Sequence, residues 1–331
     1  MHQVKYRIVR IAASLTVAGA ALLCANAVQA QSYPERAIRL IVPFPPGGQA
    51  DNVSRQLSVK ITPILGQQLI IDNRGGGAGT LGSGEVARAK PDGYTLLLAT
   101  TSTHALSPIA MSNVPYDPVK DFAPVTAIGT GPIAVSVHPS VPARTLMQLV
   151  ADTRAHPGMY SYGSSGVASI NNLAGELLKI RAGKLDILHV PYKGAGPALT
   201  ELIGGQIPIV CTTLSGALPH HRSGRVRTLA VMKEERSVSA PEIPTTAEGG
   251  VPGAIAYTYN ILLAPGETPR SVVDYLSGAM TTVMADRSFV DALVKLGVEP
   301  ITDSNPDKAA AMLKTEFEKW APLMRSLGLG H

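Results

Sequence analysis

The sequence predicts an α/β protein with two units, each a mostly parallel sheet flanked by helices. Short apolar runs bounded by turn residues indicate buried strands. Between them, apolar residues recur every three or four positions, as on one face of a helix. Strands and helices alternate along the chain, and this alternation is typical of parallel sheets. With 331 residues, 45 % of them apolar, the chain is long enough for two cores.

The first unit has the order strand, helix, strand, helix, strand. Val53, Leu57, Ile61 and Leu65 lie four residues apart and predict the first helix. The expected strands span 37–44, 68–72 and 95–100, and the second helix spans 82–89.

The second unit repeats this alternation, and helices follow it. Its strands are expected at 133–138, 160–163, 187–190, 207–212 and 227–232, and its helices at 145–155, 171–182 and 198–203. Further helices are expected at 269–286 and 307–327. The Pro-rich stretch 241–252 would return the chain to the first unit. We therefore expect residues 31–131 and 250–331 to form one domain and residues 132–249 the other.

Residues 1–30 are predicted to be a cleavable signal peptide. Lys5, Arg7 and Arg10 form a basic head, an Ala-rich apolar run follows, and small side chains precede a cleavage site near Ala30-Gln31. A membrane anchor would need about 20 strongly apolar residues, more than this run offers. We therefore expect export to the periplasm. Cleavage would lower the formal net charge from +5 to +2, because it removes the three basic residues.

The cysteines, histidines and charges disfavour several classes. Cys24 does not indicate a lipoprotein, because Leu23 stands where such signals carry a small residue. Cleavage would leave only Cys211, so we expect no internal disulfide. His220 and His221 are adjacent, and no acidic or cysteine cluster completes a metal site. The mature chain has no dense Lys/Arg cluster, which disfavours nucleic acid as a partner.

Residues 77–82 (Gly-Ala-Gly-Thr-Leu-Gly) match the G-x-G-x-x-G pattern of dinucleotide sites. Such a site needs an acidic residue about 20 positions further on, at the end of the next strand. That strand ends in Leu98-Ala99-Thr100 and has no acid. We therefore expect no nucleotide and no cofactor.

The first candidate binding loop, 43–51, joins a strand end to a helix start. Ligands of α/β folds bind at the carboxyl ends of strands, and the unpaired N–H groups of a helix start attract anions such as carboxylates. Glycines allow close approach of the backbone, and prolines reduce the entropy lost on binding. The alternative is a tight turn in which residue 51 or 52 caps the helix. The expected ligand contacts are Phe44, Pro45, Gly47, Gly48 and Asp51.

The second candidate loop, 161–169, also leads from a strand end into a helix. Its hydroxyl and N–H groups would bind a second polar or anionic group, and the expected contacts are Ser164, Ser165, Gly166 and Ser169. The alternative is a flexible loop in which Ser169 only caps the helix. The repetition of one arrangement in both units favours binding.

The third candidate loop follows the strand at 95–100. Thr101, Thr103 and His104 offer hydroxyls and one imidazole at the carboxyl end of that strand. We expect ligand contact from these residues. Alternatively His104 is a structural hydrogen-bonding residue, and catalysis by it is disfavoured.

Motifs along nearly the whole chain, taken in order, resemble the Bug-type substrate-binding receptors of the tripartite tricarboxylate transporter family. The resembling stretches are 33–34, 38–48, 72–74, 91–97, 115–125, 173–176, 189–194, 202–206, 217–220 and 262–265. The resemblance implies a two-domain Venus-flytrap fold, similar to periplasmic binding proteins, with a ligand cleft between the domains. It implies a ligand such as a di- or tricarboxylate, an acidic amino acid, or an aromatic or pyridine carboxylate or amide.

In that family the loops at 43–48 and 164–166 hold the ligand through backbone groups, hydroxyls and ordered waters, which are nearly as good as direct bonds. Tyr192, within the motif at 189–194, and Thr212 complete the expected contacts. Relatives often carry Phe-Asp-Asn where this chain has Cys211-Thr212-Thr213, so the acid that would pair with a ligand ammonium is missing. They also often have Trp-Phe-Gly where this chain has Tyr259-Asn260-Ile261, so we expect a more polar cleft there.

The sequence therefore predicts a monomeric periplasmic solute-binding protein, not an enzyme, that closes on a small organic acid and delivers it to membrane permease subunits. One alternative is a ligand-sensing subunit that docks on a sensor kinase. Another is a hydrolase that uses Ser165 as nucleophile and His104 as base. The sequence offers no candidate carboxylate to orient that histidine.

Overall fold

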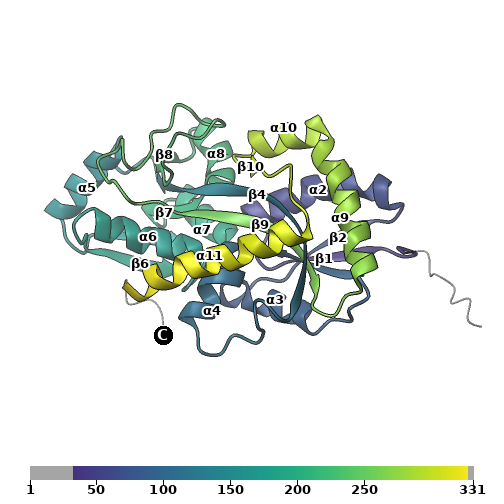
Figure 1. The fold of residues 1–331 in the computed structure, drawn as a ribbon. Helices are drawn as coiled ribbons and strands as arrows, with labels where there is room; N and C mark the ends of the chain where they lie inside the picture. The colour runs from purple at the N-terminus through teal and green to yellow at the C-terminus, as the bar shows by residue number, and fades with distance from the viewer. Residues whose placement is uncertain (1–32, 327–331) are drawn as a thin grey trace, which may run out of the picture. The chain divides into compact units, whose positions relative to one another are not determined.

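The strands of residues 33–326, the part of the chain that the computed structural model describes, form one mixed sheet (Figure 1). The predicted signal peptide, Cys24 and the cleavage site lie outside these residues. From Arg36 onward the described residues form one compact unit. The strands are β1 (Ile38–Val42), β2 (Leu69–Asn73), β3 (Thr95–Ala99), β4 (Phe122–Val137), β5 (Tyr160–Ser164), β6 (Ile187–Pro191), β7 (Ile209–Thr213), β8 (Arg227–Val231), β9 (Tyr257–Pro265) and β10 (Glu299–Pro300).

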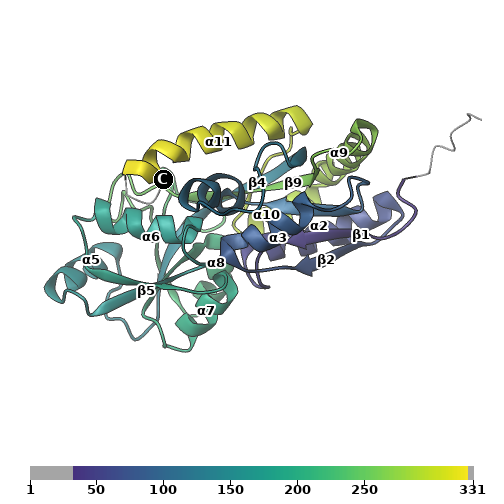
Figure 2. The same cartoon turned by 90° about the horizontal axis from the view of Figure 1, so that it is seen from below.

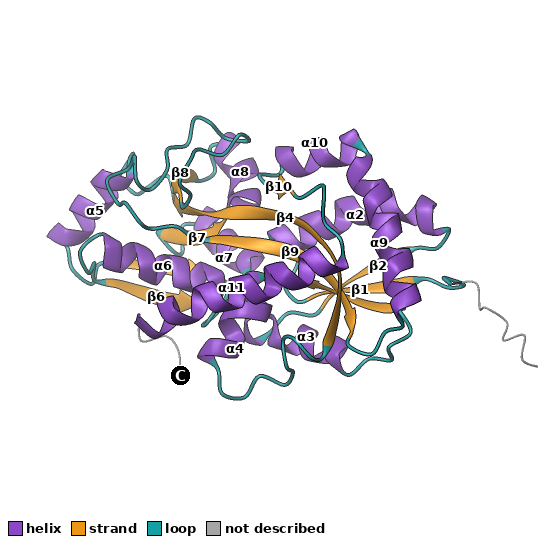
Figure 3. Ribbon diagram, in the orientation of Figure 1, coloured by secondary structure: helices purple, strands orange, loops and turns teal. Residues whose placement is uncertain are grey.

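Helices connect most of these strands and cover the sheet (Figure 3). They are α2 (Gln49–Leu65), η1 (Gly77–Gly79), α3 (Thr80–Ala87), η2 (Ser102–Leu106), α4 (Ser107–Ala110), α5 (Leu146–Ala155), α6 (Ile170–Arg181), α7 (Ala195–Ile203), α8 (Leu214–Arg222), α9 (Arg270–Ala285), α10 (Arg287–Lys295) and α11 (Pro306–Ser326). In Figure 2, α6 and α7 lie on opposite sides of β5. None of the helices in the described part of the chain is long and apolar enough to cross a bilayer.

The sheet has a parallel group of strands at each end and antiparallel strands between them. At one end β2, β1 and β3 run parallel. At the other end β7, β5 and β6 run parallel. Strand β9 is antiparallel to both β3 and β4, and β4 is antiparallel to β7 and β8. The predicted pair of parallel groups is therefore confirmed, whereas the long antiparallel strands that join them were not predicted.

Strand β4 is much longer than the strand predicted at 133–138. Its first part, up to Pro132, pairs with β9, and from Ile133 onward it pairs with β7 and β8. The register against β9 shifts next to Pro124, which accommodates a residue without a backbone N–H. No strand was predicted before Ile133, a stretch that contains Pro124 and Pro132.

Apart from the short elements η1, η2, α4 and β10, three other elements were not predicted: β9, α8 and α10. All residues of β9 except the first are buried, so the strand lacks the alternation that marks a half-exposed strand. Helix α8 contains Gly216 and Pro219, which are poor helix formers. The remaining predicted elements are present, with ends shifted by up to four residues.

Candidate functional site

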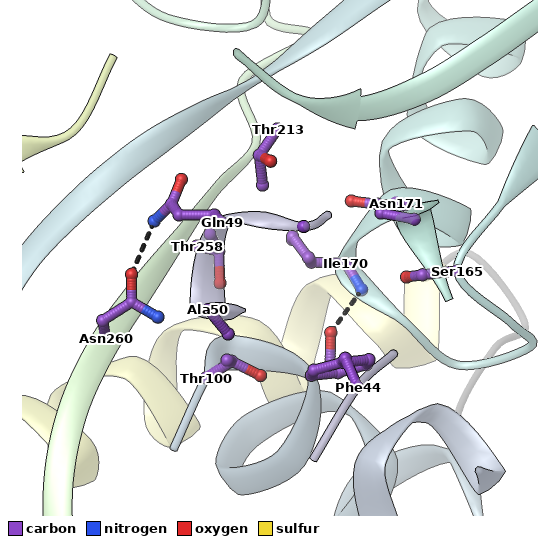
Figure 4. A pocket seen from close by; sticks show the side chains of 13 residues that line it. Phe44, Gln49, Ala50, Thr100, Ser165, Ile170, Asn171, Thr213, Thr258 and Asn260 are labelled. Atoms are coloured by element: carbon purple, nitrogen blue, oxygen red, sulfur yellow. Dashed lines mark hydrogen bonds between the residues drawn. The ribbon is translucent and has the colours of Figure 1, made fainter. Parts of the chain in front are cut away.

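The main candidate site is a cavity where strand ends of both parallel groups meet helix starts (Figure 4). Its volume is about 40 Å³, and it is partly open to solvent. Its walls are formed by Phe44, Gly48, Gln49, Ala50, Thr100, Ser102, Ser165, Ile170, Asn171, Ala195, Thr213, Thr258 and Asn260. No side chain of this wall is charged at neutral pH.

The beginnings of α2, α6, α7 and α8 all contribute to the wall. Gly48, Gly194 and Thr213, the residues that precede α2, α7 and α8, make no side-chain capping hydrogen bond. The first N–H groups of a helix have no partner within the helix, and they carry the positive end of the helix dipole. Three helix starts without side-chain caps therefore favour an anion in this cavity, although its wall has no cationic side chain.

Buried polar atoms without a partner also face the cavity. The buried side-chain atoms of residues 33–326 that lack a hydrogen-bond partner include Thr100 Oγ1, Asn171 Oδ1 and Asn260 Nδ2. All three residues are at least nine-tenths buried and line the cavity. A buried polar atom without a partner is costly, and such atoms at a cavity wall indicate groups reserved for a bound molecule.

Asp51 of the first loop supports the loop rather than lining the cavity. Its Oδ2 accepts hydrogen bonds from the Gly47 backbone N at 3.1 Å and from Arg55 Nε at 3.0 Å. Its Oδ1 accepts from Asn73 Nδ2 at 3.2 Å, and Asn73 also donates to the Phe44 carbonyl at 2.9 Å. Of the predicted contacts in this loop, Phe44 and Gly48 are part of the wall. The carboxylate of Asp51 thus holds the loop in place without lining the cavity.

Glycines let the first loop touch the start of α7. A Cβ on Gly48 would lie 3.6 Å from Ala195 Cβ, and a Cβ on Gly47 would lie 3.6 Å from Gly196 Cα. A Cβ on Gly194 would lie only 2.5 Å from Pro45 Cδ. Pro45 and Gly47 thus form part of this contact and not of the cavity wall.

The four predicted residues of the second loop have different positions. Ser165 lines the main cavity. Ser164 is fully buried, and its Oγ shares a 2.7 Å hydrogen bond with His189 Nε2. Ser169 caps α6 by accepting a hydrogen bond from the Asn172 N, and it donates to the Gly166 carbonyl. The structure therefore brings one of these serines to the main cavity, while the other two hold the loop.

The third loop contributes residues that had not been singled out. Thr100 and Ser102 are part of the wall, and Ser102 Oγ accepts a hydrogen bond from Ile170 N at 3.0 Å. Thr101 instead accepts a hydrogen bond from the Tyr259 N. Thr103 donates to the Thr100 carbonyl and accepts from the Thr100 N. The predicted threonines fix the loop, and their neighbours face the cavity.

His104 is buried away from the cavity wall. Its ring lies against Tyr116 and Phe122, and its Nδ1 shares a 2.9 Å hydrogen bond with Thr103 Oγ1. Burial lowers the pKa of His104 to about 3, because a charged imidazolium would be desolvated there. The imidazole is therefore neutral at physiological pH.

A second cavity adjoins the main one and shares Phe44 and Ser165 with it. Its remaining wall residues are Gly77, Ala78, Gly79, Met111, Gly166, Val167, Tyr192 and Lys193. The predicted contacts Gly166 and Tyr192 lie here rather than in the main cavity. Gly77 and Gly79, two of the three glycines of the G-x-G-x-x-G pattern, therefore line this second cavity.

The expected contact Thr212 does not line the main cavity, and its neighbour Thr213 does so instead. Thr213 lines the main cavity, whereas Thr212 is buried behind it and its Oγ1 has no partner among the described residues. Cys211 is also buried, and burial raises the pKa of its thiol to about 12. Neutral residues of helix starts and strand ends make up the rest of the wall. The expected contacts did not include Gln49, Ala50, Thr100, Ser102, Ile170, Asn171, Ala195, Thr213, Thr258 and Asn260, although Gln49 and Ala50 belong to the first candidate loop.

The chain is similar to known receptors over most of its length. The family described as the tripartite tricarboxylate transporter family receptor matches residues 53–329. Protein BugT of Bordetella pertussis is 33 % identical over 302 residues, which cover 91 % of this chain and 92 % of BugT.

Solved structures of periplasmic binding proteins are also similar to this chain over most of its length. The structure of the periplasmic binding protein BugD has a TM-score of 0.86 and 31 % identity, and the match covers 90 % of this chain and 99 % of BugD. R. palustris Rpa4515, solved with adipate, has a TM-score of 0.87 and 31 % identity, with coverage of 90 % and 99 %. The fold is thus the two-domain α/β fold of periplasmic binding proteins. The chain belongs to the tripartite tricarboxylate transporter receptor family.

Proposed function

We propose that this protein binds a small organic carboxylate in the main cavity and presents it to the membrane permease subunits of a tripartite transporter. The observation that carries the proposal is the cavity itself, which has helix starts without side-chain caps and no anionic side chain on its wall. Such an environment attracts an anion and holds it through N–H and hydroxyl groups. The adipate bound by the relative Rpa4515 supports a carboxylate ligand.

The pairing of β4 supports two lobes that close around this ligand. Strand β4 changes partners between Pro132 and Ile133, next to the boundary expected from the sequence. One lobe would comprise residues 31–131 and 250–331, and the other residues 132–249. The cavity draws on both, for example through Gln49 and Thr213. A ligand that contacts both lobes favours the closed form, because only that form satisfies all its groups.

Binding without chemistry fits the positions of the serines and histidines. Ser165 lines the cavity, but His104 bonds to Thr103 and its Nε2 has no partner among residues 33–326. Ser164 does pair with His189, but its side chain is fully buried and is not on the cavity wall. A serine nucleophile needs both access to the substrate and an adjacent base. We therefore infer a binding protein and not a hydrolase.

We further infer that the protein acts as a monomer in the periplasm. The family and the BugD structure support this location. Docking on permease subunits is favoured over docking on a sensor kinase, since the matching family is one of transport receptors. Crosslinking followed by identification of the captured membrane protein separates these two partners.

A thermal-shift screen of organic acids tests the proposed function. A ligand at about 100 times its Kd stabilises the folded protein by about 2.7 kcal/mol, which raises Tm by several degrees. Gly48→Val should abolish the shift, since a Cβ at this position already contacts Ala195 and a valine would extend further. The Tm without ligand shows whether the variant folds. Absence of any shift across di- and tricarboxylates and aromatic carboxylates, confirmed by calorimetry, would reject the proposal.

A further inference from the structure

An amide pair forms one end of the main cavity. Gln49 Nε2 donates a 2.8 Å hydrogen bond to Asn260 Oδ1, and both side chains are almost completely buried. Gln49 lies in the first turn of α2 and Asn260 on β9, 211 residues apart in the chain. Figure 4 shows this pair at the opposite end of the cavity from Ser165 and Asn171.

Both ends of the Gln49 amide have a neighbour. Its Oε1 lies 3.5 Å from Ser215 Oγ, and its Nε2 donates to Asn260 Oδ1. Gly131 makes room for Gln49, since a Cβ there would lie 2.0 Å from Gln49 Oε1. Asn260 Oδ1 is thus occupied as an acceptor. Its Nδ2 is a buried donor with no partner in the described part of the chain.

A free buried donor at this end selects for an acceptor. In Figure 4 the Asn260 amide nitrogen is turned toward Ala50 and the interior of the cavity. Ser215, in the first turn of α8, lies beside Gln49, and the dipole of α8 favours negative charge near its start. No Asp or Glu is part of the wall, so a ligand ammonium would find no counter-charge.

We propose that Asn260 is a specificity-determining residue, whose Nδ2 donates to a second acceptor group of the ligand. The ligand is then an organic acid with a carboxylate or carbonyl oxygen at each end, and not an amino acid. This inference rests on the proposed function, because it identifies the residue that binds the second end of the same ligand. A site built to hydrogen-bond a polar group discriminates strongly against an analogue that lacks the group.

Matched ligands of equal length test the role of Asn260. The first set is adipate, hexanoate and 6-aminohexanoate, whose second groups are a carboxylate, a methyl and an ammonium. The four-carbon set is succinate, butyrate and 4-aminobutyrate. Calorimetry at pH 8 measures each Kd with the wild type, Asn260→Leu and Asn260→Asp. Asn260→Asp keeps the acceptor for Gln49, so it retains the buried hydrogen bond even if the leucine variant fails to fold.

The wild type should bind one dicarboxylate at least ten-fold more tightly than its monocarboxylate, with the amino analogue weakest. Asn260→Leu should reduce the ratio of the two affinities toward one. Asn260→Asp should reverse the order, so that the amino analogue binds more tightly than the dicarboxylate. Asn52→Asp adds the same charge to α2 outside the cavity wall and should preserve the wild-type order.

The outcomes separate the inference from the proposed function. If the wild type binds dicarboxylate and monocarboxylate equally, or if folded Asn260→Asp keeps the wild-type order, Asn260 does not determine specificity and carboxylate binding stands. If the wild type binds no member of either set and no acid of the wider screen, the proposed function fails and the inference fails with it.

Discussion

A Cβ atom on Gly196 would lie 2.2 Å from the carbonyl oxygen of Pro46. Gly196 is in the first turn of α7, and Pro46 is in the loop between β1 and α2. The backbone of the loop therefore packs directly against the backbone of α7, with no space for a side chain. We call this contact the seam. Because Ala195 and Gly48 beside this contact are part of the cavity wall, we expect the seam to limit how closely the loop and α7 can approach around a ligand.

Gly196→Ala should weaken ligand binding while leaving the free protein folded. Alanine is a better helix former than glycine by about 1 kcal/mol, so α7 itself is not destabilised. The added methyl group forces the loop and the helix apart, and we expect at least a ten-fold increase in Kd by calorimetry. Gly278→Ala is the matched control, because a Cβ there meets nothing within 4 Å. Wild-type affinity in Gly196→Ala would contradict a seam that governs closure.

Asp51→Ala should loosen the first binding loop. The variant leaves the Gly47 N–H and the Asn73 amide without their buried acceptor. Removing one partner of a buried hydrogen bond costs about 1–3 kcal/mol, so the free energy of unfolding in urea should fall by that amount. Ligand affinity should fall as well, since the loop carries Phe44 and Gly48. Unchanged stability and affinity would mean that the loop holds its shape without this carboxylate.

His104 should make the folded protein less stable in acid. The pKa of His104 is lowered to about 3 by burial, whereas an unfolded histidine titrates near 6.5. Between these values the unfolded chain binds one more proton than the folded chain. The free energy of unfolding therefore decreases as pH falls below about 6.5, by about 1.4 kcal/mol per pH unit from this residue.

The variant His104→Phe removes this titration and keeps an aromatic ring beside Tyr116 and Phe122. Urea unfolding at pH 6 and pH 4.5 should show a smaller loss of stability in the variant than in the wild type. The acidic groups contribute equally to both proteins, so the difference reports the histidine. An equal loss in both would show that His104 is protonated in the folded state.

Glu316→Ala should destabilise the packing of α11. Glu316 is buried and accepts hydrogen bonds from Tyr257 OH at 2.5 Å and from Trp320 Nε1 at 2.8 Å. The buried Trp320 Nε1 would be left unpaired, at a cost of about 1–3 kcal/mol, whereas the partly exposed Tyr257 OH keeps its hydrogen bond from Lys319. The chain has one tryptophan, so its fluorescence in urea reports the unfolding directly. The exposed Glu318→Ala should change stability by less than about 0.5 kcal/mol, and an equal effect of both variants would contradict a specific role for Glu316.

The sequence by itself determined the two parallel groups of strands and the loops that supply most of the cavity wall. Both follow from local patterns, because apolar runs bounded by turns mark buried strands, and loops at strand ends precede helix starts. The first loop was located in this way, and Phe44, Gly48 and Gln49 within it do line the cavity.

Only the tertiary structure decided which residue of each loop faces the cavity. Every residue of β7 is buried, so no alternation of polar and apolar residues shows which of Thr212 and Thr213 points to which side. The pairing of Gln49 with Asn260 depends on β9 lying next to β4, a contact between distant parts of the chain. Local patterns hold no information on such contacts, since the packing of the whole sheet brings these residues together.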